Sequence, residues 1–159
     1  MKAKDLMIPI VDCAKVAEDR SIYDALLMID AWRARSEFDF KPRVIFVHDS
    51  DLKITGYVRL TDVVAALGGS LTSEPSSWHE LLEQVQGMIQ GLPVKDIMYH
   101  FSEKEYISED MTLEKVFLHM VSGSYTYSVV VSNNTTIGVI RLSDLFNALW
   151  KGIKTNVRK

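Results

Sequence analysis

Two segments of the chain are nearly the same: Gly56-Tyr-Val-Arg-Leu-Thr-Asp-Val-Val-Ala-Ala-Leu67 and Gly138-Val-Ile-Arg-Leu-Ser-Asp-Leu-Phe-Asn-Ala-Leu149. Gly, Arg, Leu, Asp, Ala and Leu are identical in both copies, and most of the other pairs are conservative. The pattern predicts a strand, a polar corner and a helix. Because the corner keeps Arg and Asp in fixed places twice, we expect a ligand site there.

The repeat extends over most of the chain. Lys4-Asp-Leu-Met7 matches Lys95-Asp-Ile-Met98, and Ile45-Phe-Val47 matches Val129-Val-Val131. The spacing between matched residues falls from 91 to 84 between these two matches, and to 82 at the repeated glycine. The first copy therefore carries extra residues around 36–41 and 49–53. Because loops tolerate length changes better than helices and strands do, we expect loops at both places.

Each copy has the pattern of a short helical turn, a short strand, a helix, a hairpin of two strands and a second helix, so the expected fold class is α/β (α+β). Ser21 and Thr112 are plausible N-caps, and apolar residues follow each of them at helical spacing. These stripes are Ile22, Ala25, Leu26, Ile29 and Trp32 in the first copy, and Leu113, Val116, Phe117 and Met120 in the second. The hairpin strands are expected at 44–47 and 53–58, and at 129–131 and 136–140, where Asn133-Asn134 suits a tight turn; the last helices begin near Leu60 and Leu142.

An additional segment, residues 68–93, separates the copies. Gly68-Gly-Ser opens it and Gly91-Leu-Pro93 closes it, and both are helix breakers. Apolar residues between them follow helical spacing and predict an amphipathic helix from about Ser77 to Gln90. This helix either packs on the core of its own module or offers a face to a second subunit.

The composition is that of an ordinary globular protein. The chain has 159 residues, 47% hydrophobic residues and a formal net charge of −3, which gives no global attraction to nucleic acid or anionic membrane. The basic residues Lys151, Lys154, Arg158 and Lys159 suit a solvated tail better than a nucleic-acid contact. One cysteine, no signal-peptide run and no apolar stretch of spanning length favour a cytoplasmic protein that binds neither nucleic acid nor membrane.

The sequence shows no catalytic signature, so we expect no enzymatic activity and no required cofactor. G-x-S-x-G, Walker A, G-x-G-x-x-G and H-E-x-x-H are all absent. His119 is expected to be a partly buried structural residue rather than a metal ligand, and Cys13 a small buried hydrophobe rather than a nucleophile. The paired acids Glu18-Asp19 and Glu109-Asp110 suit the start of a helix better than catalysis.

The repeated corner permits two interpretations. Asp62 and Asp144 fall in the first turn of a helix, where Thr61 or Ser143 can cap. A carboxylate there can accept hydrogen bonds from both hydroxyls of a ribose, while Arg59 or Arg141 holds a phosphate. Alternatively, each aspartate caps its helix and each arginine pairs with the nearby aspartate.

These residues resemble a known family. The chain is similar to a tandem pair of CBS (cystathionine-β-synthase) domains, also called a Bateman module. The likeness rests on Lys-Asp-[Leu/Ile]-Met at the start of each copy, the β-α-β-β-α order and the Gly-h-h-x-x-[Thr/Ser]-Asp corner. It implies a first CBS domain at residues 1–68, a linker with a helix at 69–93, a second CBS domain at 94–153 and a basic tail at 154–159. It also implies two domains related by a pseudo-two-fold axis, with two clefts between them.

In many members of the family these clefts bind adenine nucleotides such as AMP, ADP or ATP, or S-adenosylmethionine. The resemblance places Asp62 and Asp144 on the ribose. Arg59 and Arg141 stand where the family commonly has Thr or Ser near the phosphate, and the hydroxyls of this chain, Thr61 and Ser143, lie one place before the aspartate. The family holds adenine by backbone groups, which map to Lys15-Val16 and Arg43 in the first copy and to Tyr106-Ile107 and Tyr127 in the second.

Two functions follow from the resemblance. The first is a stand-alone regulatory module that binds an adenine nucleotide in its clefts and signals by conformational change to an unknown effector protein. The second is a ligand-free structural or dimerisation module, in which Arg59 and Arg141 fill the clefts. The family implies a homodimer in either case.

Overall fold

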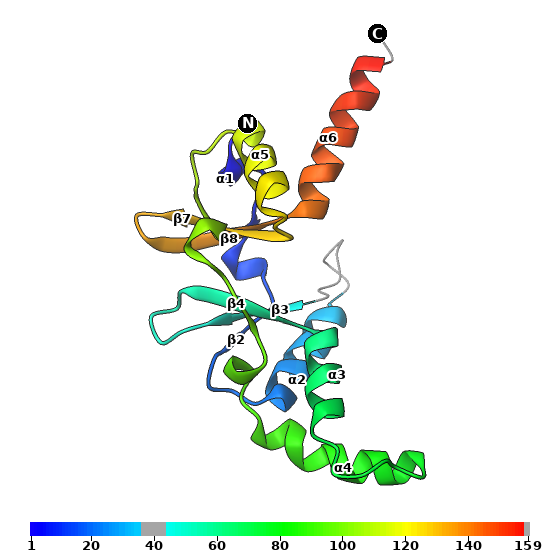
Figure 1. Cartoon of the computed structure of the whole chain (residues 1–159). Coiled ribbons are helices and arrows are strands. Elements are labelled where there is room, and N and C mark those ends of the chain that lie inside the picture. Colours follow the sequence, from blue (N-terminus) through cyan, green and yellow to red (C-terminus); the bar gives the residue numbers. More distant parts are fainter. Residues whose placement is uncertain (36–43, 158–159) are drawn as a thin grey trace. The chain divides into compact units, whose positions relative to one another are not determined.

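The computed structural model describes residues 1–35 and 44–157 and contains two four-stranded sheets (Figure 1). The first has the strand order β2 (Lys15–Ala17), β3 (Val44–His48), β4 (Ile54–Arg59), β5 (Tyr99–His100). The second has the order β1 (Ile8–Pro9), β8 (Thr135–Arg141), β7 (Tyr127–Ser132), β6 (Tyr106–Ser108). In each sheet a three-residue edge strand runs parallel to the hairpin strand beside it. The predicted fold class is confirmed.

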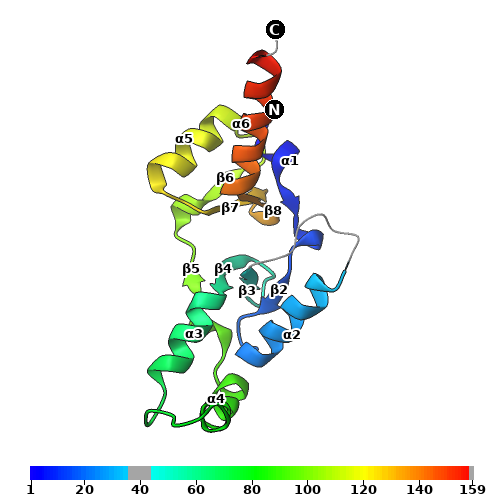
Figure 2. The same ribbon diagram turned by 90° about the vertical axis from the view of Figure 1, so that its right-hand side faces the viewer.

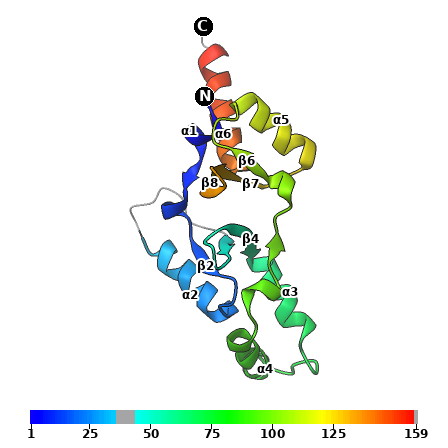
Figure 3. The ribbon, with the colours of Figure 1, turned by 90° about the vertical axis from the view of Figure 1, so that its left-hand side faces the viewer.

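The helices follow the predicted order. The longer ones are α2 (Ile22–Arg33), α3 (Leu60–Gly69), α4 (Trp78–Gly91), α5 (Leu113–Gly123) and α6 (Leu142–Val157), and the short ones are α1 (Ala3–Leu6), η1 (Ile10–Asp12), η2 (Val94–Asp96) and η3 (Glu103–Glu105). Helices α2 and α3 cover one face of the first sheet (Figure 2), and α5 and α6 cover one face of the second (Figure 3). The predicted turn at Asn133-Asn134 is confirmed, because both residues have positive φ, 49° and 63°. The loop expected around 36–41 lies outside the described residues.

The two predicted N-caps behave differently. Ser21 accepts a hydrogen bond from the backbone N–H of Asp24 at 3.1 Å and so caps α2 as expected. Thr112 stands at the N-cap of α5, but its side chain accepts no hydrogen bond from that helix's first turn. The predicted stripes are buried at Ile22, Ala25 and Ile29 and at Val116 and Met120. Phe117 was expected on the same stripe and is 39% exposed, because it lies at the margin of the helix face on which Val116 and Met120 are buried.

The chain forms two compact units, residues 14–100 and residues 1–13 with 101–159. Domain boundaries drawn from the sequence repeat place all residues of one copy in one domain. In the structure, the first residues of each copy belong to the unit formed by the rest of the other copy. Strand β5 joins the first sheet through the pairing Gly56↔His100, and β1 joins the second through Pro9↔Gly138. The exchange follows from pairing, since each short opening strand completes the hairpin of the other copy.

The repeated glycines make these pairings possible. A Cβ at Gly56 would overlap the backbone oxygen of Tyr99 and the side chain of Met98. A Cβ at Gly138 would lie 2.6 Å from both the backbone oxygen of Ile8 and the sulfur of Met7. Real Cβ atoms do not approach other atoms this closely, so the identical glycine in both copies reserves room for an exchanged strand.

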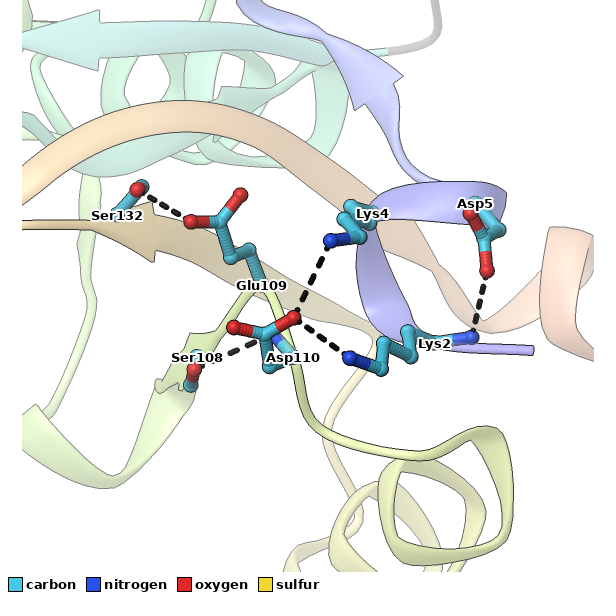
Figure 4. Close-up of polar contacts among 7 residues, drawn as sticks. All are labelled: Lys2, Lys4, Asp5, Ser108, Glu109, Asp110 and Ser132. Atoms are coloured by element: carbon cyan, nitrogen blue, oxygen red, sulfur yellow. Dashed lines mark hydrogen bonds and ion pairs between the residues drawn. The ribbon is translucent and has the colours of Figure 1, made fainter.

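The first residues of the chain are fastened to the turn between β6 and α5 (Figure 4). The Nζ atoms of Lys2 and Lys4 lie 2.9 and 3.2 Å from the same Asp110 oxygen. The backbone N–H of Ala3 donates to Met111 at 2.8 Å, and the Ala3 side chain is fully buried. In the same turn Glu109 accepts a hydrogen bond from Ser132 at 2.5 Å. The acids Glu109 and Asp110 therefore have structural partners.

Helix α4 has the predicted place and cap. It begins at Trp78, and Ser77 accepts the backbone N–H of Glu80 at 3.1 Å. The helix contacts α2 and α3, which supports packing on its own unit. None of its residues is fully buried, and Trp78 is 72% exposed, so part of its apolar face remains available for another surface.

Candidate functional site

In the unit of residues 14–100, the predicted site residues lie at one end of the strands. Strands β2 and β3 begin at this end of the sheet and antiparallel β4 finishes there, with Lys15 opposite Phe46 and Val44 opposite Arg59. Helix α3 begins directly after Arg59 and carries Asp62 in its first turn. The predicted residue Arg43 lies outside the described residues.

The Arg59 guanidinium donates two hydrogen bonds to the Asp62 carboxylate, one to each oxygen. Nε lies 3.0 Å from Oδ2, and Nη2 lies 2.8 Å from Oδ1. The backbone N–H of Arg59 also donates to Oδ2 at 2.8 Å. These hydrogen bonds, led by those of the guanidinium, hold the pKa of Asp62 below its ordinary value although burial opposes the shift. Asp62 is therefore an ionised carboxylate with a cation on its bidentate edge.

The second unit repeats this corner with a tighter pair. Arg141 Nε lies 2.7 Å from Asp144 Oδ2, and Nη2 lies 2.6 Å from Oδ1. The Arg141 side chain is 25% exposed, whereas that of Arg59 is 49% exposed. The hydrogen bond to Asp144 raises the pKa of Arg141 against the effect of burial. Tyr127 pairs directly with Arg141 across the β7–β8 ladder, so this predicted residue lies at the same end of the sheet as Arg141.

The adenine positions expected from the resemblance lie on edge strands. Val16 and Ile107 are 6% and 2% exposed and belong to the cores of their units, so only their backbone can meet a ligand. Lys15 and Tyr106 precede them at the starts of β2 and β6 and are half-buried. Among the described residues, β2 and β6 are the outer strands of their sheets, with β3 and β7 as their neighbours.

Thr61 and Ser143 do not cap the last helices. Each is the second residue of its helix, α3 or α6, and each is exposed. The N-cap of α3 is Arg59, whose backbone N–H is taken by the Asp62 carboxylate. The capping role expected for the two hydroxyls is therefore wrong, because both helices begin two residues before the aspartate.

Comparison with known proteins gives the same fold. Residues 94–151 match the family model of the CBS domain. A CBS-domain protein of unknown function from Bacillus anthracis is 18% identical, with a TM-score of 0.68 over 95% of this chain and 94% of that one. This chain has the fold of a tandem CBS-domain protein. A search of curated proteins finds no match.

Two other solved structures similar to this chain contain nucleotides. CBSX2, solved in complex with AMP, is 19% identical, with a TM-score of 0.63 over 94% of this chain and 96% of that one. The CBS domain of a bacterial CNNM/CorC family Mg²⁺ transporter, solved in complex with ATP, is 13% identical, with a TM-score of 0.66 over 92% of this chain and 85% of that one. At these identities the likeness establishes the fold.

The unit of residues 14–100 also carries a shallow groove of about 490 Å³ between β2 and α2. Its lining includes Lys15 and Val16 and, in addition, Arg20, Asp24 and His48. No motif in the sequence singles out the last three residues as a site. The only signal for two of them is the i,i+4 spacing of Arg20 and Asp24, whose charged atoms are 3.8 Å apart.

The residues assigned structural roles have the predicted surroundings. Cys13 is 2% exposed, and its sulfur lies 3.5 Å from the backbone oxygen of Pro9. His119 is half-buried, and its ring lies 5.1 Å from that of Tyr125. Within residues 1–35 and 44–157, no three His, Cys, Asp or Glu side chains gather as a metal site would require, and no helix has the length and apolarity to span a bilayer.

Proposed function

We propose that this CBS pair is a regulatory, non-catalytic module that binds an adenine nucleotide at its Arg–Asp corners and signals to an effector protein by conformational change. The observation that carries the proposal is the corner itself, an aspartate paired with an arginine through two hydrogen bonds at a helix start, built twice. The AMP in CBSX2 and the ATP in the transporter's CBS domain support the choice of ligand.

Each corner offers complementary groups for a nucleotide. The carboxylate of Asp62 or Asp144 accepts hydrogen bonds from the two ribose hydroxyls, and Arg59 or Arg141 donates to a phosphate in bidentate fashion. The helix start beside them favours the negative charge. The backbone of Lys15-Val16 and of Tyr106-Ile107, with Tyr127, holds the adenine, and Thr61 and Ser143 line the helix start.

Signalling requires that the nucleotide bind one conformation of the module better than another. A ligand shifts such an equilibrium only by its difference in affinity for the two states. Cellular nucleotide concentrations need only micromolar to millimolar affinity, about −8 to −4 kcal/mol, which a few charge-assisted hydrogen bonds can supply.

Titration calorimetry with AMP, ADP, ATP and GTP tests the proposal. An adenine nucleotide at about 100 times its Kd is expected to stabilise the protein by about 2.7 kcal/mol, which appears as a higher Tm. Asp62→Ala and Asp144→Ala are expected to remove that part of the binding heat and of the Tm rise which belongs to their corner. Asp30→Ala, at an exposed position on α2, serves as the control. Flat calorimetry at millimolar nucleotide would reject the proposal.

A second candidate function is a ligand-free structural or dimerisation module. The closed geometry of both Arg–Asp pairs favours it, because the guanidinium groups already satisfy the carboxylates. In that case Arg59→Ala and Arg141→Ala would lower the Tm, and no nucleotide would change the Tm of the wild-type protein. A homodimer is part of both proposals.

A further inference from the structure

Each arginine occupies the carboxylate edge that a ribose would need. Arg59 Nε and Nη2 take one oxygen each of Asp62, and Arg141 does the same to Asp144. Asp62 Oδ2 additionally accepts the backbone N–H of Arg59. The group assigned to accept the ribose hydroxyls and the group assigned to donate to the phosphate are therefore bonded to each other.

The joined pair competes with the ribose. An ionised carboxylate has about four lone-pair positions, and three N–H groups already point at Asp62. The Asp62 side chain is only 16% exposed, and that of Asp144 17%, so little of either carboxylate is open to a second bidentate partner. A ribose that binds through both hydroxyls must therefore displace the guanidinium.

A displaced guanidinium needs another acceptor. Hydrogen bonds between charged groups are stronger than those between neutral groups, so breaking the pair without replacement is unfavourable. Two oxygens of a phosphate can replace the carboxylate, because they accept the same pair of guanidinium N–H groups in bidentate fashion. An uncharged nucleoside offers no such replacement, and a cationic ligand such as S-adenosylmethionine adds a positive charge beside the freed arginine.

We propose that Arg59–Asp62 and Arg141–Asp144 are latches that admit nucleoside phosphates and exclude ligands without a phosphate. This inference rests on the proposed nucleotide-binding function and specifies its ligand class. Binding breaks the hydrogen bonds between the guanidinium and the carboxylate. The carboxylate then accepts hydrogen bonds from the ribose hydroxyls, and the guanidinium donates to the phosphate. Affinity therefore follows the phosphate rather than the adenosine that all these ligands share.

Calorimetry of the full chain with adenosine, S-adenosylmethionine, AMP and ATP tests the latch. Wild-type protein is expected to bind AMP and ATP at least about tenfold more tightly than either ligand without phosphate. Arg59→Met and Arg141→Met keep the length of the aliphatic chain and remove the donors. Each is expected to bind adenosine about tenfold more tightly than wild type at its corner, and ATP more weakly.

Opposite changes for two ligands separate a latch from a general structural defect, which would weaken both. Arg33→Met, at an exposed position at the end of α2, is the matched control and should leave the preference unchanged. The latch is overturned, with nucleotide binding intact, if wild type binds adenosine as tightly as ATP or if the Met variants weaken both ligands alike. If none of the four ligands binds any of these proteins at millimolar concentration, the proposed function fails and the latch fails with it.

Discussion

Three N–H donors, all from Arg59, surround the Asp62 carboxylate at 2.8–3.0 Å. They lower the pKa of Asp62 from its ordinary value of 3.8. A carboxyl whose pKa is lower in the folded than in the unfolded protein stabilises the fold above its unfolded pKa, and this contribution is lost as the pH falls through the folded pKa. We therefore expect the stability conferred by the Asp62 charge to be complete near neutral pH, to begin to fall near pH 3.8 and to be lost only below the lower pKa of the folded protein.

Thermal unfolding of the wild type and of Asp62→Asn measures this contribution. The variant keeps one oxygen that can accept the backbone N–H and Nε of Arg59, and it loses the negative charge together with the acceptor of Nη2. Its Tm deficit should be constant near neutral pH and should shrink toward zero below about pH 3.8. Asp30→Asn, on the exposed side of α2, is the control and should change the Tm little. A deficit for Asp62→Asn that is the same at every pH would contradict the lowered pKa.

The chemistry of the corner could be predicted from the sequence, but its closed state could not. Residues three apart at a helix start can meet, and so the Arg–Asp pair was one of two interpretations of the repeat. The choice depends on the rotamer of a long, partly exposed side chain, which no sequence pattern fixes. Val16 and Ile107 show the converse case, since their burial follows from apolar character while any ligand contact rests on backbone groups without a side-chain signature.

At the scale of helices and strands, the repeated glycine is the residue on which strand exchange depends. We expect Gly56→Ala to destabilise the protein by about 3 kcal/mol, the upper end of overpacking effects, because its Cβ would overlap backbone atoms of β5. Gly138→Ala should destabilise it less, since the nearest atoms lie 2.6 Å away and one of them is the flexible Met7 side chain. Urea unfolding gives both free energies.

Gly68→Ala is the matched control for these substitutions. Gly68 lies in α3 with negative φ, and a Cβ there would meet nothing within 4 Å. Alanine is a better helix former than glycine by about 0.5–1 kcal/mol, so this variant should be slightly more stable than wild type. Equal effects of Gly56→Ala and Gly68→Ala would show that β5 does not pack closely against Gly56.

The sequence predicted the elements better than it predicted their partners. Periodicity and capping located α2, α4 and both hairpins, because these depend on local pattern. The exchange of β1 and β5 was not predicted, since aligning two copies shows which segments are equivalent and not which sheet each segment joins. Each of these strands has only two residues, too few for a pattern of alternation.

At the scale of the whole molecule, each compact unit needs chain from both copies. Residues 1–13 belong to the unit with residues 101–159. They supply it with β1, with the buried Ala3 and with the two lysines that pair with Asp110. Residues 94–100 supply β5 and the buried Val94 to the other. A fragment cut at the repeat boundary would leave an open sheet edge and an exposed part of the core, so the two copies are bound to fold as one chain.

The unit of residues 1–13 and 101–159 leaves two helices with apolar surface uncovered. Helix α6 exposes a stripe of apolar residues at i, i+3, i+4 and i+7 spacing. Helix α5, which covers the same sheet, exposes three further apolar residues. On α6 the stripe is Phe146, Leu149, Trp150 and Ile153, 43–61% exposed, and on α5 the residues are Phe117, Leu118 and Val121, 39–62% exposed. Single exposed apolar residues are common, but a continuous stripe of this kind marks an interface.

We expect this stripe to be buried between two copies of the chain, because a self-complementary two-fold contact is the commonest way to cover such a surface. Wild-type protein should then show twice the 18.0 kDa chain mass in light scattering. Phe146→Glu with Ile153→Glu should give a monomer that keeps its helical circular dichroism, since charged residues at the centre of the stripe would be buried without partners. The control is the variant with Asn147→Glu and Thr155→Glu, which introduces two glutamates on α6 outside the stripe. This variant should remain dimeric. A wild-type monomer at high concentration, or a dimer that survives the Phe146 and Ile153 changes, would assign this surface to the effector protein instead.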